Sequence, residues 1–209
     1  MLARISKNIF NKKICNKITK RYIQTLNYGE GIPSETVYDS SDYSDEKILD
    51  VLGNERIAVI GYGPQGRAQA LNLMDRGLDV VVGLREDSSS WTQAEFDGFN
   101  NNRLLAIDEA TDYGTIIMNL LSDSGQIEQF PLMKKYLRKG DALYFSHGFG
   151  VTYSDKTGMN VDELDDIDVI MVAPKGCGGS VRDYFVNGDG GINSSYAVYQ
   201  NKTGKAKER

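Results

Sequence analysis

Residues 56–84 read RIAVIGYGPQGRAQALNLMDRGLDVVVGL and contain the pattern that most clearly indicates the fold. The apolar run at 56–60 predicts a buried strand, and the pattern after the glycines predicts a helix over 66–76. A second apolar run at 79–84 predicts another strand. Strand, helix and strand joined by short connections form one βαβ unit, in which the two strands lie parallel.

The same alternation continues toward the C-terminus. Three further strands are expected at 115–121, 142–146 and 168–173, with a helix at 126–138 between the first two. Alternating strands and helices favour the α/β class. We therefore expect a doubly wound, mostly parallel sheet of the Rossmann type, covered by helices on both faces and built without an internal repeat.

The glycine-rich turn Gly61–Gly66, GYGPQG, lies directly between the first strand and the helix. This is the context that a dinucleotide-binding fingerprint requires. Gly61 allows a tight turn, Gly63 lets a pyrophosphate approach the backbone, and Gly66 lets helix and strand pack closely. The N-terminus of the helix would face the anion. Glycine-rich turns also occur without a ligand, but the position of this one favours a nucleotide.

The end of the second strand bears on which dinucleotide binds. An NAD-binding unit usually places Asp or Glu there, whereas this sequence reads GLREDSSSW. Arg85 offers a planar fork suited to a phosphate dianion, and Ser88 and Ser90 offer hydroxyl donors on a loop. These residues favour NADPH. Glu86 and Asp87 would repel a 2′-phosphate unless they point to solvent, and a solvated polar loop is the alternative interpretation.

Three predicted strands end in short segments at 120–123, 146–149 and 173–176. Ligands bind at the carboxyl ends of the strands in an open parallel sheet, so these segments should converge on one crevice. His147 titrates naturally near neutral pH, and Lys175 adds a cation. A lone histidine is more often structural and a surface lysine often does nothing specific, so a catalytic role for both depends on that convergence.

The composition excludes several classes of protein. The 209 residues carry 24 basic and 29 acidic side chains, a net charge of −5 and a pI near 5.0, which argues against a nucleic-acid partner. The longest apolar runs fall short of the roughly 18 residues of a membrane span, so no membrane partner is expected. Two cysteines, Cys15 and Cys177, and a single histidine argue against a disulfide framework or a zinc site with several His and Cys ligands.

Basic residues are concentrated at the N-terminus. Residues 1–29 hold seven Lys or Arg and no acid, with apolar side chains near one helical face. Such an amphipathic segment is typical of a mitochondrial presequence, which would be removed before the acidic stretch that begins near Glu30. A disordered basic arm or a nucleic-acid-binding tail is the alternative. Residues 30–209 would then form the folded domain.

Six separate motifs follow one another along the chain. They are IAVIGYGPQGRAQALNL, VVVGLREDSSSW, MNLLSDSGQ, YFSHGFG, VIMVAPKG and GINSSYAVYQNKTGKAKE. As an ordered set they closely resemble the N-terminal, NADPH-binding part of the ketol-acid reductoisomerases, also called acetohydroxy-acid isomeroreductases. The chain looks most like the fungal-type mitochondrial forms, from about Asn27 to the last residue.

The resemblance implies roles for particular residues. The cofactor-binding set that it implies is Gly61, Tyr62, Gly63, Pro64, Gln65, Gly66, Arg85, Ser88, Ser90, Asp123, Ser124, Gly125, Gln126 and Gly178. The serines and Arg85 would hold the 2′-phosphate, and residues 123–126 with Gly178 would line the nicotinamide side. His147 matches the active-site histidine of the family, and Lys175 matches the lysine near its metal and substrate site.

It also implies a reaction. A 2-aceto-2-hydroxy acid, 2-acetolactate or 2-aceto-2-hydroxybutyrate, undergoes a magnesium-dependent alkyl shift and is reduced by NADPH to a 2,3-dihydroxy acid, a step in valine and isoleucine synthesis. Divalent ions polarise the carbonyl and hydroxyl oxygens, and the nucleotide domain delivers the hydride. The full-length form would be a homodimer or a higher homo-oligomer.

The sequence departs from this family in its loops and at its end. Residues 177–179 differ from the usual loop, and 188–191 carry one extra glycine. At 205–209 the chain stops where the family enters a helical, knotted C-terminal domain, which carries the magnesium ligands. The acids at 162–168 do not match those ligands, and we interpret them as a solvated run, so no metal site is expected here. We expect a chain that binds NADPH but is inactive alone; a catalytically inactive nucleotide-binding module and another NADP-dependent hydroxyacid dehydrogenase are the alternatives.

Overall fold

The computed structural model describes residues 24–27, 29–100, 102–188 and 191–209. Most of the predicted presequence therefore lies outside the described residues. The chain divides into two compact units, residues 1–42 and 43–209. In the first unit, β1 (Gln24–Leu26) pairs antiparallel with β2 (Glu35–Val37), and a 3₁₀ turn follows at Ser40–Asp42.

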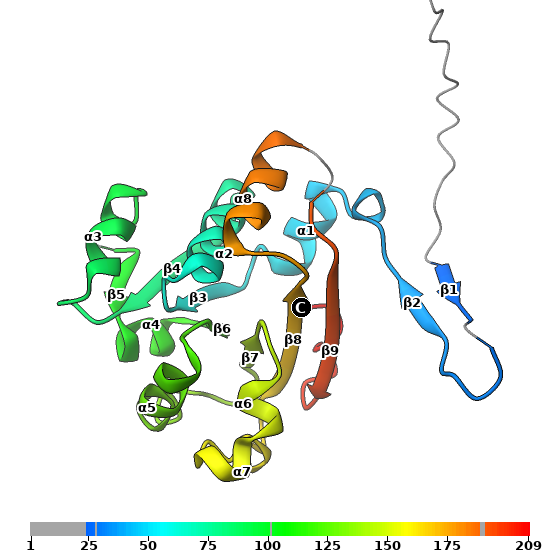
Figure 1. Ribbon diagram of the computed structural model, residues 1–209. Coiled ribbons are helices and arrows are strands. Elements are labelled where there is room, and N and C mark those ends of the chain that lie inside the picture. The colour runs from blue at the N-terminus through cyan, green and yellow to red at the C-terminus, as the bar shows by residue number, and fades with distance from the viewer. Residues whose placement is uncertain (1–23, 28, 101, 189–190) are drawn as a thin grey trace, which may run out of the picture. The chain divides into compact units, whose positions relative to one another are not determined.

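The second unit is built on a sheet of seven described strands (Figure 1). They are β3 (Arg56–Ile60), β4 (Asp79–Leu84), β5 (Leu104–Ala106), β6 (Ile116–Asn119), β7 (Ala142–Phe145), β8 (Asp168–Pro174) and β9 (Ser194–Gln200). Across the sheet the order is β5-β4-β3-β6-β7-β8-β9, and every neighbouring pair is parallel except β8 and β9. This confirms the predicted mostly parallel sheet.

Helices cover both faces of the sheet (Figure 1). They are α1 (Asp45–Leu52), α2 (Pro64–Asp75), α3 (Ser89–Phe96), α4 (Ile107–Tyr113), α5 (Asp123–Met133), α6 (Phe149–Thr152), α7 (Ser154–Thr157) and α8 (Gly178–Asn187). α2 packs on one face with α8 beside it, and α4 and α5 pack on the other. None of the helices in the described part of the chain has the length and apolar character needed to cross a bilayer.

Strand β3 shows why the central strands read as unbroken apolar runs. Successive side chains of a strand point to opposite faces of the sheet. Ile57 and Val59 accordingly belong to the apolar cluster on the α2 side, and Ala58 and Ile60 belong to the cluster on the α4 and α5 side. All four are at most 2% exposed. Because both faces are buried, neither face has room for polar positions.

The strand order reverses between β3 and β6. From β3 the chain builds outward through β4 and β5, and it then returns to β6 on the other side of β3. In open α/β sheets a crevice forms at this reversal, outside the carboxyl ends of the strands. The fold therefore brings the segments that follow Ile60 and Asn119 to one place.

The structure shifts several predicted boundaries. α2 begins at Pro64 instead of residue 66, because proline at the first helical position forgoes no helical hydrogen bond. α5 begins at Asp123 instead of residue 126, since the Ser122 hydroxyl caps it by accepting the Gly125 N–H at 3.3 Å.

Some elements carry no clear sequence signal, among them β9 and α3. β9 is exposed along most of its length, so no apolar alternation marks it. α3 buries only Ala94, which leaves its helical periodicity weak. As a result, the expectation that both serines lie on a loop was wrong for Ser90, which lies in the first turn of α3, whereas Ser88 ends the loop as the N-cap of that helix.

Candidate nucleotide-binding site

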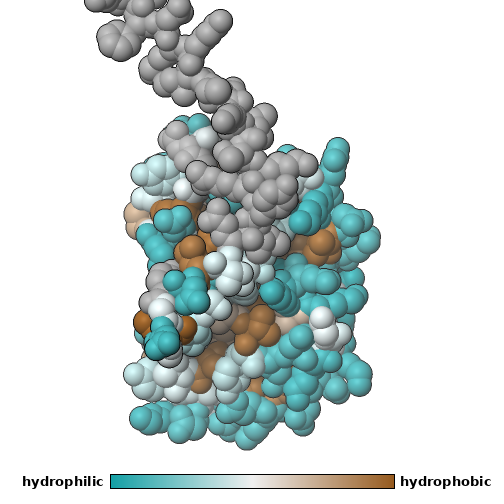
Figure 2. Space-filling model, turned by 90° about the vertical axis from the view of Figure 1, so that its right-hand side faces the viewer, coloured by the Kyte–Doolittle hydropathy of each residue, from teal (hydrophilic) through white to brown (hydrophobic). Residues whose placement is uncertain are grey.

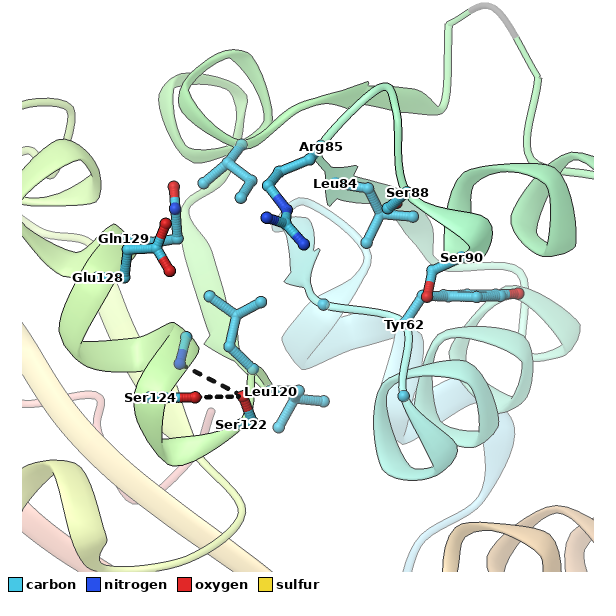
Figure 3. A pocket seen from close by; sticks show the side chains of 15 residues that line it. Tyr62, Leu84, Arg85, Ser88, Ser90, Leu120, Ser122, Ser124, Glu128 and Gln129 are labelled. Atoms are coloured by element: carbon cyan, nitrogen blue, oxygen red, sulfur yellow. Dashed lines mark hydrogen bonds between the residues drawn. The ribbon is translucent and has the colours of Figure 1, made fainter.

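A cleft with a volume of about 300 Å³ opens at the carboxyl ends of β3, β4 and β6, where the strand order reverses (Figure 3). Of the predicted cofactor-binding residues, the cleft is lined by Gly61, Tyr62, Gly63, Arg85, Ser88, Ser90, Ser124 and Gly125. Its other lining residues are Leu84, Ile107, Leu120, Leu121, Ser122, Glu128 and Gln129. Leu120, Leu121 and Ser122 belong to the segment 120–123 that was expected at the crevice. The structure thus brings most of the predicted set together.

The three glycines of the turn meet different surroundings. Gly61 has a φ of +99°, and a Cβ there would lie 2.9 Å from the Leu120 carbonyl oxygen. A Cβ on Gly66 would lie 2.2 Å from the Gly61 carbonyl oxygen. A Cβ on Gly63 would meet no atom within 4 Å, and Gly63 lines the cleft. Gly61 and Gly66 therefore serve close packing, whereas Gly63 leaves open space at the N-terminus of α2, where an anion is favoured.

Arg85 and Ser88 line the side of the cleft formed by β4 and α3. Figure 3 shows the Arg85 guanidinium pointing into the cleft. The side chain of Ser88 does not cap α3, although the residue occupies the N-cap. The Ser88 Oγ atom is buried and has no hydrogen-bond partner among the described residues. A buried hydroxyl is normally satisfied by a partner, so this side of the cleft fits a group rich in acceptor oxygens, such as a phosphate.

Carboxylates near Arg85 occupy two kinds of position. Glu86 and Asp87 are exposed, and neither lines the cleft. Glu128 does line it, and in Figure 3 Glu128 and Gln129 extend from α5 on the side of the cleft opposite Ser88 and Ser90. Both residues lie inside the helix predicted at 126–138, and sequence reasoning missed them because the packing of α5 decides which of its polar side chains face the cleft.

The N-terminus of α5 forms the opposite wall. The Ser122 hydroxyl lies 3.3 Å from the Ser124 hydroxyl and accepts the Gly125 N–H (Figure 3). Gln126, by contrast, is 1% exposed and donates from Nε2 to the Leu121 carbonyl oxygen at 3.1 Å. Its side chain therefore lies beneath the surface of the cleft, and a contact of Gln126 with a cofactor stays a prediction.

His147 and Lys175 lie outside the lining of the cleft, at the ends of the neighbouring strands β7 and β8. The His147 Nε2 atom is 3.6 Å from Asp123 Oδ1 and 3.5 Å from Gln126 Nε2. The structure thus brings the ends of β6 and β7 together, as predicted. Lys175 is exposed, and its backbone N–H donates to the Asn193 carbonyl oxygen at 2.8 Å.

The start of α8 packs directly on the start of α2. A Cβ on Gly178 would lie 1.8 Å from the Pro64 carbonyl oxygen. The Gln65 Nε2 atom donates to the Gly176 carbonyl oxygen at 2.8 Å. Gly178 and Gln65 thus hold the starts of α8 and α2 together. A contact of either residue with a cofactor stays a prediction.

In the part of the chain that the structure describes, no group of three or more His, Cys, Asp or Glu side chains is arranged to hold a metal ion. The acids at 162–168 make other contacts. Glu163 pairs with Lys134 at 3.1 Å. Asp168, which was expected to be solvated, is fully buried and accepts the Lys202 N–H at 2.7 Å, because β8 begins there in the interior of the sheet.

The strand order, the glycine turn and the cleft at the reversal together define a dinucleotide-binding domain of the Rossmann type. Comparison with known proteins then identifies the family. The chain belongs to the family described as acetohydroxy acid isomeroreductase, NADPH-binding domain, which matches residues 51–209. The predicted resemblance is confirmed.

Named relatives agree with this assignment. The ketol-acid reductoisomerase (NAD(+)) of Desulfosudis oleivorans is 52% identical over 186 residues, which are 88% of this chain and 51% of that protein. The mitochondrial ketol-acid reductoisomerase of Saccharomyces cerevisiae is 47% identical over 193 residues, 92% of this chain and 48% of that protein. The structure of an NADH-preferring ketol-acid reductoisomerase from an uncultured archean superimposes with a TM-score of 0.72 at 38% identity, covering 81% of this chain and 49% of that one. The chain therefore spans about half the length of the relatives that it matches.

Proposed function

We propose that this chain is the NADPH-binding part of a ketol-acid reductoisomerase. The complete enzyme would convert 2-acetolactate or 2-aceto-2-hydroxybutyrate to a 2,3-dihydroxy acid in valine and isoleucine synthesis. The observation that carries the proposal is the cleft at the strand reversal, with open space at Gly63 and a buried, unpartnered hydroxyl at Ser88. Family membership supports the same reaction class.

The choice of NADPH rests on the chain's own residues, since relatives named for NAD and NADH also match it. The Arg85 guanidinium points into the cleft. Domains that bind NADH usually have an Asp or Glu at this position, whose carboxylate binds the ribose hydroxyl. Ser88 adds a donor without a partner. Glu86 and Asp87 are exposed and outside the lining, so neither stands in the way of a phosphate. These features support a 2′-phosphate at this side of the cleft.

In the proposed complex, different sides of the cleft would bind different parts of the cofactor. The backbone at Gly63 and the N-terminus of α2 would bind the pyrophosphate. The forked guanidinium of Arg85 would bind the 2′-phosphate through charge-assisted hydrogen bonds. The bound dinucleotide supplies the hydride that reduces the substrate.

His147 and Lys175 are proposed to act at the reacting end. The imidazole of His147 is half-exposed beside Asp123 and would contact the substrate. Lys175 would offer a positive charge to an anionic substrate. We place the magnesium ligands, much of the substrate pocket and the contacts of a homodimer or larger homo-oligomer in the half of the relatives' length that this chain does not span.

We also propose that the protein acts in mitochondria. The basic, acid-free segment at 1–29 supports this location. Relatives from fungi carry the word mitochondrial in their names, including that of Neurospora crassa at 51% identity.

The test is a titration of the purified chain with NADPH and NADH, before and after Arg85→Ala. A hydrogen bond to a charged group contributes about 1.5 to 3 kcal/mol, so the variant should bind NADPH about 10-fold to 150-fold more weakly. NADH lacks the 2′-phosphate, and its affinity should stay within about twofold.

Arg138→Ala is the matched control. Arg138 is also an exposed arginine, it pairs with Asp112, and it lies outside the cleft lining. This variant should bind both cofactors like the unaltered chain. Equal losses of NADPH and NADH affinity in Arg85→Ala would mean that Arg85 supports the fold and does not contact the phosphate.

A further inference from the structure

Tyr62 lies in the glycine turn and lines the cleft, yet its hydroxyl is bound to a residue outside that lining. The side chain is 5% exposed, and its hydroxyl donates to Asp97 Oδ2 at 2.9 Å. Its ring packs edge-on against the ring of Phe99, with centroids 5.8 Å apart and planes at 78°. Asp97 is the C-cap of α3, so the turn that would bind the pyrophosphate is attached to the far end of the helix that begins at Ser89.

Asp97 has a second partner on a third element. Arg67, in the first turns of α2, places its Nε atom 2.5 Å from Asp97 Oδ2 and its Nη2 atom 2.8 Å from Asp97 Oδ1. Such forked pairs combine charge with fixed geometry. The Asp97 side chain is only 7% exposed, and the Arg67 guanidinium holds the pKa of its carboxyl below the usual range. The carboxylate therefore keeps both partners at neutral pH.

Helix α3 has little else to fix its orientation. Of its eight residues only Ala94 is buried, although Trp91 packs partly against the core. A short helix that buries one methyl group and part of one indole ring gains little from apolar burial. The hydrogen bonds at Asp97 therefore provide much of the constraint on its direction.

From this arrangement we propose that Tyr62, Arg67 and Asp97 are positioning residues that set the discrimination between NADPH and NADH. The inference rests on the proposed function, in which the 2′-phosphate binds beside Arg85 and Ser88, at the N-terminus of α3. NADPH has to contact the glycine turn and that first turn at once, so it needs both in a fixed relation. NADH carries no 2′-phosphate, so its binding does not depend on a fixed position of α3 relative to the glycine turn.

Loss of the Asp97 contacts would lower the population of molecules in which α3 has the orientation that binds NADPH. If loss of the Asp97 contacts left α3 in the binding-competent orientation for about a tenth of the time, the Kd for NADPH would rise about 10-fold. A ligand with equal affinity for both orientations is insensitive to the change. The Kd for NADH should therefore stay within about twofold.

The experiment compares Asp97→Asn, Tyr62→Phe and the control Asp112→Asn with the unaltered chain. Asp112 is also paired with an arginine, Arg138, and lies outside the cleft lining. NADPH and NADH are titrated by calorimetry. Hydrogen exchange of residues 89–96 is measured without cofactor, which reports on α3 independently of binding.

The proposal expects the Kd for NADPH to rise about 10-fold in Asp97→Asn and about threefold in Tyr62→Phe, which loses only one hydroxyl. It also expects faster exchange in α3 for both, with Asp112→Asn unchanged. Parallel losses of NADPH and NADH affinity would overturn it, because they would indicate a general defect of the fold. An unaltered NADPH affinity in both variants would overturn it as well. A failure of the proposed function is distinct, since it appears in the unaltered chain as no preference for NADPH.

The exposed apolar side chains around β9 support no comparable proposal. Tyr196, Val198 and Tyr199 on β9 are 44%, 38% and 52% exposed, and brown patches are visible on the face shown in Figure 2. Nothing in the structure indicates what would cover them.

Discussion

Two alanine substitutions in the glycine turn, Gly63→Ala and Gly66→Ala, should affect different properties: one the affinity for the cofactor, the other the stability of the fold. The residues are three positions apart and receive the same methyl group. At Gly66 the new Cβ would lie 2.2 Å from the Gly61 carbonyl oxygen, whereas at Gly63 it would meet no atom within 4 Å. Gly66→Ala should therefore damage the fold, and Gly63→Ala should damage binding alone.

The cost at Gly66 follows from that distance. Ordinary contact begins near 3.4 Å, so helix and turn must separate by about 1 Å. Both clashing groups belong to the backbone and cannot rotate away. Overpacking of this kind costs about 1 to 3 kcal/mol, which corresponds to a Tm lower by roughly 2 to 12 °C in a domain of this size.

At Gly63 the substitution should weaken cofactor binding and leave the stability of the fold nearly unchanged. Its φ of −69° and ψ of −175° suit alanine, and the poorer N-cap is offset by the reduced freedom of the unfolded chain, so stability should change by less than about 0.5 kcal/mol. The methyl group would occupy space that a pyrophosphate needs. Losing a hydrogen bond to that charged group should weaken NADPH about 10-fold to 150-fold. NADH shares the pyrophosphate and should weaken equally.

Thermal unfolding by circular dichroism without ligand and calorimetric titration with both cofactors give the two readouts. Gly179→Ala is the matched control, because Gly179 also has open space around its Cα and lies outside the cleft lining. If Gly63→Ala bound NADPH like the unaltered chain, the pyrophosphate would not bind at the turn. If Gly66→Ala kept its Tm, the close approach to Gly61 would not constrain the fold.

Two further predictions concern the reacting end and the location. In the complete enzyme, His147→Ala should lower kcat at least about 100-fold while the Kd for NADPH stays within about twofold. The reason is that the imidazole lies beside Asp123 and outside the cleft lining. A loss of NADPH affinity with an unchanged kcat would mean that His147 has a structural role. A fluorescent protein fused behind residues 1–35 should enter mitochondria, and a fusion that stayed in the cytosol would refute the targeting role of the basic segment.

Much of the site was accessible to sequence reasoning because its determinants are local. Gly61, Gly63 and Gly66 are separated by fixed intervals between an apolar run and a helix, and that spacing alone prescribes the turn. Arg85 follows the next strand, so its position at the sheet edge is set by the same short unit. The ends of β6 and β7 were expected to meet, and the contact of His147 with Asp123 bears this out.

Other features depend on contacts between distant segments. Tyr62 lines the cleft, and its contact with a cofactor stays a prediction, but the partner of its hydroxyl, Asp97, lies 35 positions later in the chain. Glu128 lies in a helix that was predicted, but its place in the lining of the cleft depends on how α5 packs beside the strand ends. β9 exists as a strand through pairing with β8, since its own side chains are mostly exposed.

The α/β class, the nucleotide turn and the family can be recognised in the sequence, because apolar runs buried on both faces and glycines at fixed spacing are short-range properties of the chain. Which side chains share the cleft, and which ones hold α3 in place, depends on the tertiary structure. Those relations arise from the strand order and the register of the sheet, which juxtapose residues far apart in sequence through packing that no local pattern encodes.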